Sequence, residues 1–388
     1  MSTASTSPAP SPSRLFSASV ALRSQFFVSG ALFASWGVHV PTVKLHYDLG
    51  EQSLAIAMLA AGVGALAALA QAGRVVGRHG PRMVSLITGL LCCLFISGLI
   101  AFESYTALLV LMLGFGACAS LFDVSINAEA SEIERLAERP LMSGFHGMFS
   151  LGGMVGAGLG SFAISVGMSA QQHLLLAAGL CAPAIVIAAA AMLKMEAPPP
   201  GEKQPLSLPR GPLLLIGVLA AMGLITEGAM YDWSVLFMKQ DRGSDASLAA
   251  MAYASFSAAM AAGRFGGDWI RGHLSPVTLM RGSGALAALG MALALFVPSP
   301  AVALIAFALV GLGLSNVVPV LFSAASKIPG VSPAHGIAAV SSLGYLGMMA
   351  GPPLIGMVAQ ASSLTAGLVV VVVFAVVMAV SAGRALRA

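Results

Sequence analysis

Side chains able to do chemistry are rare in this sequence, and several of them interrupt long apolar stretches. Glu227 lies in the apolar run Pro212–Met238, and Tyr231 follows four residues later, the spacing that places two side chains on one face of a helix. Burial favours the neutral form of a carboxyl, so Glu227 is a candidate proton acceptor. The alternative is a structural Glu bonded to a neighbouring helix. Asp232 and Trp233 follow directly, as substrate-binding residues or as anchors near the helix end.

A second polar group is centred on Asp123, which lies in the apolar run Tyr105–Ala128. Asn127 is one helical turn further on, and His146 lies near the start of the next run, Met142–Val166, at a similar depth. We expect these three side chains to meet. A carboxylate beside an imidazole favours the charged ring, so Asp123 and His146 form a candidate proton relay or inner gate. The alternative is a static polar clasp between two helices.

Other polar residues complete the candidate site. Trp36 closes an apolar run and lines the mouth of a cavity or anchors the helix end, while Asn316 can bond a solute from another run. Arg264 and Asp268 are four residues apart, and we expect them to pair.

The cysteines and histidines lack metal-ligand spacing, and Walker, His-Glu-x-x-His and Gly-x-Ser-x-Gly motifs do not occur. The sequence therefore predicts no metal, no cofactor and no enzyme.

The composition requires that membrane helices position these groups. Of 388 residues, 9% are charged and 58% are hydrophobic, whereas about 25% are charged in an ordinary soluble domain. The mean hydropathy is +0.91. So few charges cannot cover the surface of a soluble protein, which excludes a water-soluble enzyme. The apolar runs are continuous rather than alternating, which excludes a β-barrel and predicts an all-α polytopic membrane protein.

The apolar runs are long enough to define transmembrane spans, since a helix needs about 20 apolar residues to cross a bilayer. We expect twelve: Phe16–Val40, Ser53–Val76, Met83–Phe102, Tyr105–Ala128, Met142–Val166, His173–Leu193, Pro212–Met238, Ser247–Ile270, Pro276–Val297, Pro300–Ala324, Ala334–Ala359 and Leu364–Val380. The charged residues from Glu129 to Arg139 are expected on a solvated surface helix.

The loops indicate orientation and domain organisation. Three of 19 Lys and Arg residues (Lys44, Lys239 and Arg242) fall on one side, and the rest share the side of both termini, which is therefore cytoplasmic. Residues 1–13 are expected to be a disordered tail, and the Pro-rich residues 194–211 a linker between bundles 14–193 and 212–388. The basic residues are spread over many loops, so we expect no nucleic-acid partner, and we expect a monomer.

Short repeats support two similar halves. Ala72-Gly73-Arg74 returns as Ala262-Gly263-Arg264, and Ser150-Leu151-Gly152 returns as Ser342-Leu343-Gly344. Gly114-Phe115-Gly116 is echoed by Gly311-Leu312-Gly313, so all three offsets lie between 190 and 197 residues. Each match relates one span to the span six places later. This is the pattern expected when two halves with the same orientation are related by a two-fold axis along the membrane normal.

The turn Gly73–Arg82 resembles the signature loop of the major facilitator superfamily, Gly-x-x-x-Asp-Arg-x-Gly-Arg-Arg, except that Gly77 replaces the acidic residue. In that family the acidic residue helps to latch the cytoplasmic side, so the resemblance implies a latch that is lost or displaced, with Asp268 as the candidate substitute. The gate and signature-loop residues that the resemblance assigns are Gly73, Arg74, Arg78, Gly80, Arg82, Arg264 and Asp268.

Two further segments resemble a bacterial branch of that superfamily near the fucose permeases: Asp123–Ala128 followed by His146-Gly147, and Glu227–Trp233. The resemblance implies two six-helix bundles related by pseudo-two-fold symmetry, in a bacterial inner (plasma) membrane. It also implies uptake by alternating access around a site near the midplane.

We therefore expect a secondary transporter of a small polar solute, sugar-like or organic-acid-like, coupled to protons. Its partners are the small-molecule substrate, protons and the lipid bilayer. Efflux of amphipathic compounds is the alternative, although central aromatic residues are scarce, and a non-transporting membrane sensor is a third reading. The expected proton-coupling residues are Glu227, Asp123 and His146, and the expected substrate-binding residues are Tyr231, Asn127, Trp36, Asn316, Asp232 and Trp233.

Overall fold

The computed structural model describes residues 11–139, 141–193, 211–329, 331 and 333–386, apart from the side chains of residues 268, 333–335 and 338. All regular structure in these residues is helical. The expected disordered tail and the expected linker lie almost entirely outside the described residues. The first helix nevertheless begins at Pro12, inside the segment expected to be tail.

The first half of the chain forms α1 (Pro12–His46), α2 (Glu51–His79), α3 (Pro81–Ser97), α4 (Tyr105–Ala137), α5 (Met142–Ser165) and α6 (Ala170–Ala191). The second half forms α7 (Pro212–Gln240), α8 (Ala246–Phe265), α9 (Gly267–His273), α10 (Pro276–Phe296), α11 (Pro300–Leu314), α12 (Val317–Ala325), α13 (Pro333–Ala361) and α14 (Leu364–Ala385).

The twelve expected spans are confirmed in number and order within the described residues. Eleven helical segments are long and apolar enough to cross a membrane, with α11 and α12 counted together, and α3 adds a shorter apolar helix of 17 residues. Two expected spans are interrupted. The span expected at Ser247–Ile270 divides into α8, which ends at Phe265, and α9, which begins at Gly267. The span expected at Pro300–Ala324 divides where α11 ends at Leu314 and α12 begins at Val317. Asn316 lies in this break.

Local sequence signals explain where many helices begin. Proline occupies the first turn of α1, α3, α7, α10 and α11, where its missing N–H leaves no helical hydrogen bond unmade. Serine caps α6 at Ser169 and α14 at Ser363 by accepting a backbone N–H. Gly80 joins α2 to α3 with φ +78°, a conformation that side-chain-bearing residues rarely adopt, so this turn requires glycine.

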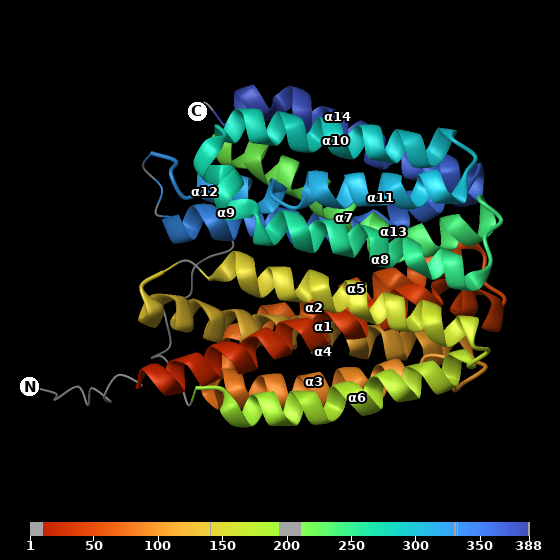
Figure 1. Cartoon of the computed structure of the whole chain (residues 1–388), viewed down its shortest axis with the longest axis horizontal. Helices are drawn as coiled ribbons and strands as arrows, with labels where there is room; N and C mark the ends of the chain where they lie inside the picture. Colours follow the sequence, from red (N-terminus) through yellow and green to blue (C-terminus); the bar gives the residue numbers. More distant parts are fainter. Residues whose placement is uncertain (1–10, 140, 194–210, 330, 332, 387–388) are drawn as a thin grey trace, which may run out of the picture.

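The helices form two bundles that lie side by side along their length (Figure 1). Helices α1–α6 make one bundle and α7–α14 the other, and both chain ends emerge at the same end of the molecule, which we call the terminal end. Helix α5 packs against α8, α2 against α13, and α1 against α7, so these six helices form the boundary between the bundles. A site shared by both halves must lie there.

Glycines allow unusually close packing of α1 on α5 inside the first bundle. A Cβ atom at Gly30 of α1 would collide with the backbone carbonyl of Phe149 of α5. Similarly, a Cβ atom at Gly152 of α5 would collide with the backbone of Phe27 of α1. Membrane helices gain van der Waals contact from such small-residue stripes, which fixes the position of α5 at the bundle boundary.

Helix α4 is longer than expected, and this corrects one prediction. It continues from Ala128 to Ala137, and Glu129 is fully buried and accepts the backbone N–H of Leu193 at 2.8 Å. The expectation of a solvated surface helix is therefore wrong for Glu129. Its carboxylate holds the end of α6 instead. Further along, Glu132 pairs with the exposed Arg135, as a solvated face would.

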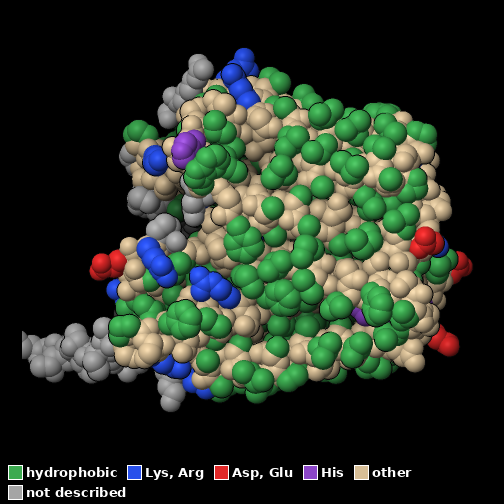
Figure 2. Space-filling model, in the orientation of Figure 1, with side chains coloured by type: hydrophobic (Ala, Val, Ile, Leu, Met, Phe, Trp, Pro, Cys, Tyr) green, Lys and Arg blue, Asp and Glu red, His purple; other side chains and the backbone are tan. Residues whose placement is uncertain are grey.

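The surface has the character expected of a bilayer protein. Apolar side chains cover the middle of the face in Figure 2, while Lys and Arg gather at the terminal end. Most of the Asp and Glu side chains visible on this face lie at the opposite end.

Candidate functional site

A buried ion pair joins α7 to α8 inside the second bundle. The Arg264 guanidinium lies 2.9 Å from Glu227 Oε1, and the two side chains are 13% and 10% exposed. The Tyr231 hydroxyl donates to the same oxygen at 3.2 Å. The expected shared face of Glu227 and Tyr231 is therefore confirmed. Charges at membrane depth are costly unless they are paired, and this arrangement compensates both.

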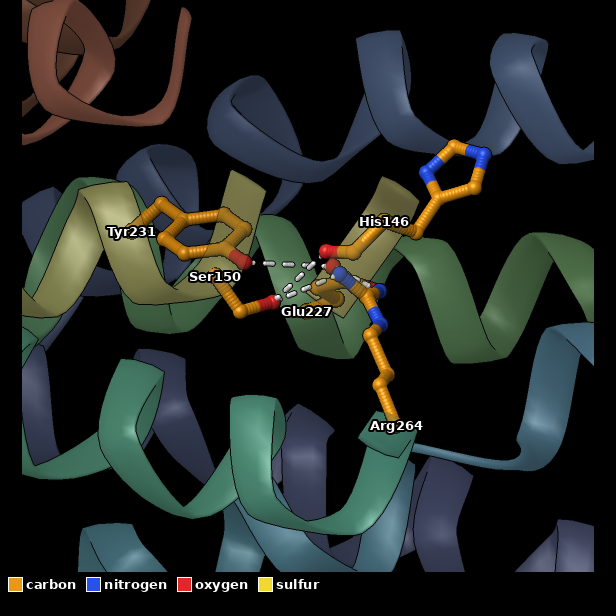
Figure 3. A network of polar contacts seen from close by, with 5 residues as sticks. All are labelled: His146, Ser150, Glu227, Tyr231 and Arg264. Atoms are coloured by element: carbon orange, nitrogen blue, oxygen red, sulfur yellow. Dashed lines mark hydrogen bonds and ion pairs between the residues drawn. The ribbon is translucent and has the colours of Figure 1, made fainter. Parts of the chain in front are cut away.

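Arg264 also reaches across the boundary between the bundles. Its Nη1 donates to the Ser150 hydroxyl of α5 at 2.8 Å, and Ser150 in turn donates to the backbone oxygen of His146 at 3.4 Å. Figure 3 shows the resulting network, in which one guanidinium connects the two halves. Arg264 was expected to pair with Asp268, whose side chain lies outside the described residues.

The predicted relay between Asp123 and His146 is wrong in this structure. Asn127 Nδ2 donates to Asp123 Oδ1 at 3.0 Å, as expected, but no hydrogen bond or ion pair among the described residues joins Asp123 to His146. The His146 ring packs edge-on against Phe26 and points away from the network (Figure 3). The reason is that α1 packs against both α4 and α5, and its Phe26 occupies the place beside the imidazole.

Asp123 faces the other bundle instead. It is partly exposed and interacts electrostatically with Tyr345 of α13, a residue that is itself 43% exposed. A carboxyl expected beside a histidine of its own half therefore lies opposite a tyrosine of the second half.

Trp36 and Asp232 meet across the bundle boundary. The indole Nε1 of Trp36 in α1 donates to Asp232 Oδ1 of α7 at 3.4 Å, and Trp36 is buried. Neighbouring Trp233 is also buried, and its indole N–H has no hydrogen-bond partner in the described part of the chain. Burial contradicts the alternative in which these tryptophans are anchors at the lipid interface. Trp36 and Asp232 come together, whereas a contact of Trp233 with solute stays a prediction.

Asn316 supports the helix break between α11 and α12. Its amide donates to the carbonyl of Gly263 at 3.3 Å and to the Ser315 hydroxyl at 3.1 Å. Its oxygen accepts from Arg271 at 3.3 Å, and Arg271 also donates to Ser143 of α5 at 3.1 Å. These bonds occupy the amide, so Asn316 links α8, α9 and α12 near the terminal end.

The signature-loop residues lie at the terminal end of α2 and the start of α3. Arg74 donates to Gln71 of its own helix at 3.1 Å, and a Cβ atom at Gly73 or Gly77 would meet only open space. Arg82 interacts electrostatically with the buried Glu129. The acidic partner of this loop is thus on α4, while the roles of Arg78 and Gly80 in gating stay predictions.

Two residues of this region were missed by the sequence reasoning. Ser150 was noticed only as part of a repeat, and Tyr253 of α8 was not singled out. The Tyr253 ring lies 5.1 Å from that of Tyr231, and no described residue forms a hydrogen bond with its buried hydroxyl. A polar residue in an apolar helix was the available signal, but it is too common in this chain to select these two.

Comparison with known proteins agrees with this architecture. The profile described as Major Facilitator Superfamily matches residues 24–335. An uncharacterized MFS-type transporter of Yersinia pestis is 35% identical over 369 residues, covering 95% of this chain and 96% of that one.

Solved structures share the fold at low sequence identity. The nucleoside transporter NupG has a TM-score of 0.74 at 14% identity, covering 95% of this chain and 99% of its own. The E. coli fucose:proton symporter FucP has a TM-score of 0.62 at 15% identity, covering 95% and 98%. The described residues hold eleven apolar helical segments of membrane-spanning length and one shorter apolar helix, in two bundles. Together with a matching profile over most of the sequence and a full-length relative, they lead to one conclusion: the chain belongs to the major facilitator superfamily.

Proposed function

We propose that the chain is a secondary active transporter that moves a small polar solute, sugar-like or organic-acid-like, across the inner membrane by proton-coupled alternating access. The observation that carries the proposal is the Glu227–Arg264 ion pair, which lies beside the bundle boundary and contacts Ser150 of the opposite bundle. Apolar residues would fill a purely structural position at lower cost, so a buried ion pair in a chain with few charges favours a functional role.

The network supports a specific coupling step. Arg264 binds Glu227 within its own bundle and Ser150 in the other bundle. A proton on Glu227 removes the negative partner, which changes how firmly the guanidinium is held and therefore biases the contact between the bundles. We assign Glu227 the role of proton acceptor and Arg264 the role of linking the proton to bundle movement.

The solute site in this proposal lies between the bundles, beside the ion pair. Tyr231 contributes an aromatic face one turn from Glu227, and Trp36 and Asp232 contribute polar groups from α1 and α7. Asp123 and Asn127 are partly exposed and line the path on the α4 side.

The comparisons favour this substrate class and coupling. The two structural neighbours are described as a nucleoside transporter and a fucose:proton symporter, and both names denote polar solutes. The Lys and Arg side chains that gather at the terminal end favour cytoplasmic termini.

Proton-driven efflux of amphipathic compounds is the second candidate, and one observation favours it. The Tyr231 ring lies within 5.1–6.4 Å of the rings of Tyr253, Phe256 and Phe149, so the centre holds more aromatic surface than expected from the sequence. Such rings suit a flat apolar solute as well as the face of a sugar.

The test is solute-dependent proton movement in proteoliposomes that contain a pH-sensitive dye. A screen of sugars, organic acids, amino acids and amphipathic drugs by thermal shift supplies the solutes. We expect a polar solute, added without any imposed gradient, to acidify the lumen only in vesicles with protein. Solute entry without proton movement would contradict the coupling. Alkalinisation of the lumen by added amphipathic compounds alone would favour the second candidate, because efflux driven by protons exchanges the compound for a proton.

A further inference from the structure

Asp232 is the single partly exposed residue in the middle of α7. From Ile225 to Met238 every other side chain of this helix is buried. Helices α1, α8, α13 and α14 pack around α7. The hydrogen bond from Trp36 of α1 places the Asp232 carboxylate at the boundary between the bundles rather than on the lipid-facing surface.

The charge of Asp232 has no cationic partner among the described side chains. Its one hydrogen bond comes from the Trp36 indole at 3.4 Å. The nearby Arg264 is bound to Glu227, and the ion pairs of the described residues involve Glu51, Glu132 and Glu227. A carboxylate at this depth is costly without a counter-charge, so Asp232 needs a cation or a proton from outside the chain.

A hydroxyl without a partner lies within electrostatic range of this carboxylate. Tyr253 is 1% exposed, its oxygen has no hydrogen-bond partner among the described residues, and it interacts electrostatically with both Asp232 and Glu227. A buried polar group without a partner is unfavourable, and in this position beside the bundle boundary a ligand group could complete the Tyr253 hydroxyl. The rings of Tyr231 and Tyr253, 5.1 Å apart, supply aromatic faces of the kind that stabilise a bound cation.

We propose that Asp232, with Trp36 and Tyr253 around it, binds a protonated amine, and that the transported solute is therefore a small polar molecule carrying an ammonium group. This assignment rests on the proposed transport function and narrows its substrate class. Asp232 lies five residues beyond Glu227, about 7.5 Å along the helix axis and about 140° around it, so the two carboxyls lie on different faces of α7. Tyr231 directly precedes Asp232, so a solute with its amine at Asp232 places its hydroxyl groups near Tyr231 in this proposal.

The test uses matched solutes that differ only in an amine and a hydroxyl, namely glucosamine against glucose and ethanolamine against ethylene glycol. Binding to the full-length protein in lipid nanodiscs is measured at neutral pH by thermal shift and calorimetry. A hydrogen bond to a charged group is worth about 1.5–3 kcal/mol, so we expect the amine of at least one pair to bind about tenfold to hundredfold more tightly.

The variants decide whether Asp232 provides that preference. Asp232→Asn should bind both members of the pair equally, while Asp245→Asn should keep the preference. Asp245 caps α8 through Leu248 N, a role that asparagine fills equally well. A melting curve of each variant without solute reports its folding.

Each result separates this inference from the proposed function. Equal binding of amine and hydroxyl solutes by the wild type, or a preference that persists in Asp232→Asn, would overturn the inference and indicate that a proton neutralises Asp232. Transport of the hydroxyl solutes alone would also overturn it while leaving proton-coupled transport intact. Amine binding that needs Asp232, in a protein that moves no solute, would support the binding site and contradict the transport function.

Discussion

At the scale of single residues, the partners of each buried carboxyl decide what it can do. Glu227 has a guanidinium and a phenol, so its charge is compensated inside the protein. Among the described residues, Asp123 is hydrogen-bonded by the amide of Asn127 and Asp232 by the indole of Trp36, and neither carboxyl forms an ion pair. The three carboxyls therefore differ in function, although the sequence alone ranks them by depth.

Replacing Glu227 by Gln tests the coupling step. The Gln oxygen can still accept from Arg264, so Glu227→Gln imitates a permanently protonated Glu. We expect proton-driven uptake to fall to the level of empty liposomes, while counterflow exchange of labelled for unlabelled solute continues, because exchange requires no proton release. Both are measured in proteoliposomes.

The matched control is Glu132→Gln, which removes an exposed ion pair with Arg135. Exposed ion pairs contribute about 0–1 kcal/mol to folding stability, so this variant should fold and should show the same proton-driven uptake as the wild type. Full proton-driven uptake by Glu227→Gln would remove Glu227 from the mechanism.

The sequence predicted the part of the site that is local along the chain. Helical spacing placed Tyr231 beside Glu227 and Asn127 beside Asp123, and both contacts are present. The sequence could not predict the Glu227–Arg264 pair, because the two residues are 37 positions apart on different helices. Which side of each helix faces the other depends on how the helices pack. For the same reason His146 was paired wrongly with Asp123.

At the scale of elements, glycine contacts hold α5 where it can present Ser150 to the second bundle. Gly152 lies against the backbone of α1, whereas Gly158 of the same helix has open space where a Cβ would be. Alanine at position 152 would therefore collide with the α1 backbone, whereas alanine at position 158 would meet no atom.

We expect Gly152→Ala to destabilise the protein and Gly158→Ala to leave stability nearly unchanged. Overpacking costs about 1–3 kcal/mol when the backbone must move, as it must where the obstacle is the Phe27 backbone. Melting temperature and the half-life of the purified protein in detergent measure the effect. Equal melting curves for both variants would show that α1 and α5 can move apart at Gly152 without loss of stability.

Apolar length predicted the spans because lipid demands helices that satisfy their own backbone hydrogen bonds. The extension of α4 and the break between α11 and α12 depend on polar contacts that hydropathy does not contain. Glu129 stays helical and buried because it bonds Leu193, and Asn316 interrupts its span where it bonds Gly263.

At the scale of the whole molecule, contacts of α5 with α8 and α9 hold the bundles together along their length. Ser161 bonds Ser247 near the end opposite the termini, Arg264 bonds Ser150 further along, and Arg271 bonds Ser143 near the terminal end. Alternating access requires the contacts at each end to separate in turn. The Ser161–Ser247 contact must therefore open whenever the site faces the non-terminal side.

A disulfide between these two positions tests alternating access most directly. The hydroxyl oxygens of Ser161 and Ser247 are 3.1 Å apart, close enough for paired cysteines to bond once Cys92, Cys93, Cys118 and Cys181 have been replaced. Solute uptake is measured in proteoliposomes with the double variant oxidised and then reduced, with Ser161→Cys and Ser247→Cys alone as controls. We predict that oxidation stops uptake only in the double variant and that a reductant restores it, whereas undiminished uptake by fully cross-linked protein would contradict transport by movement of the two bundles.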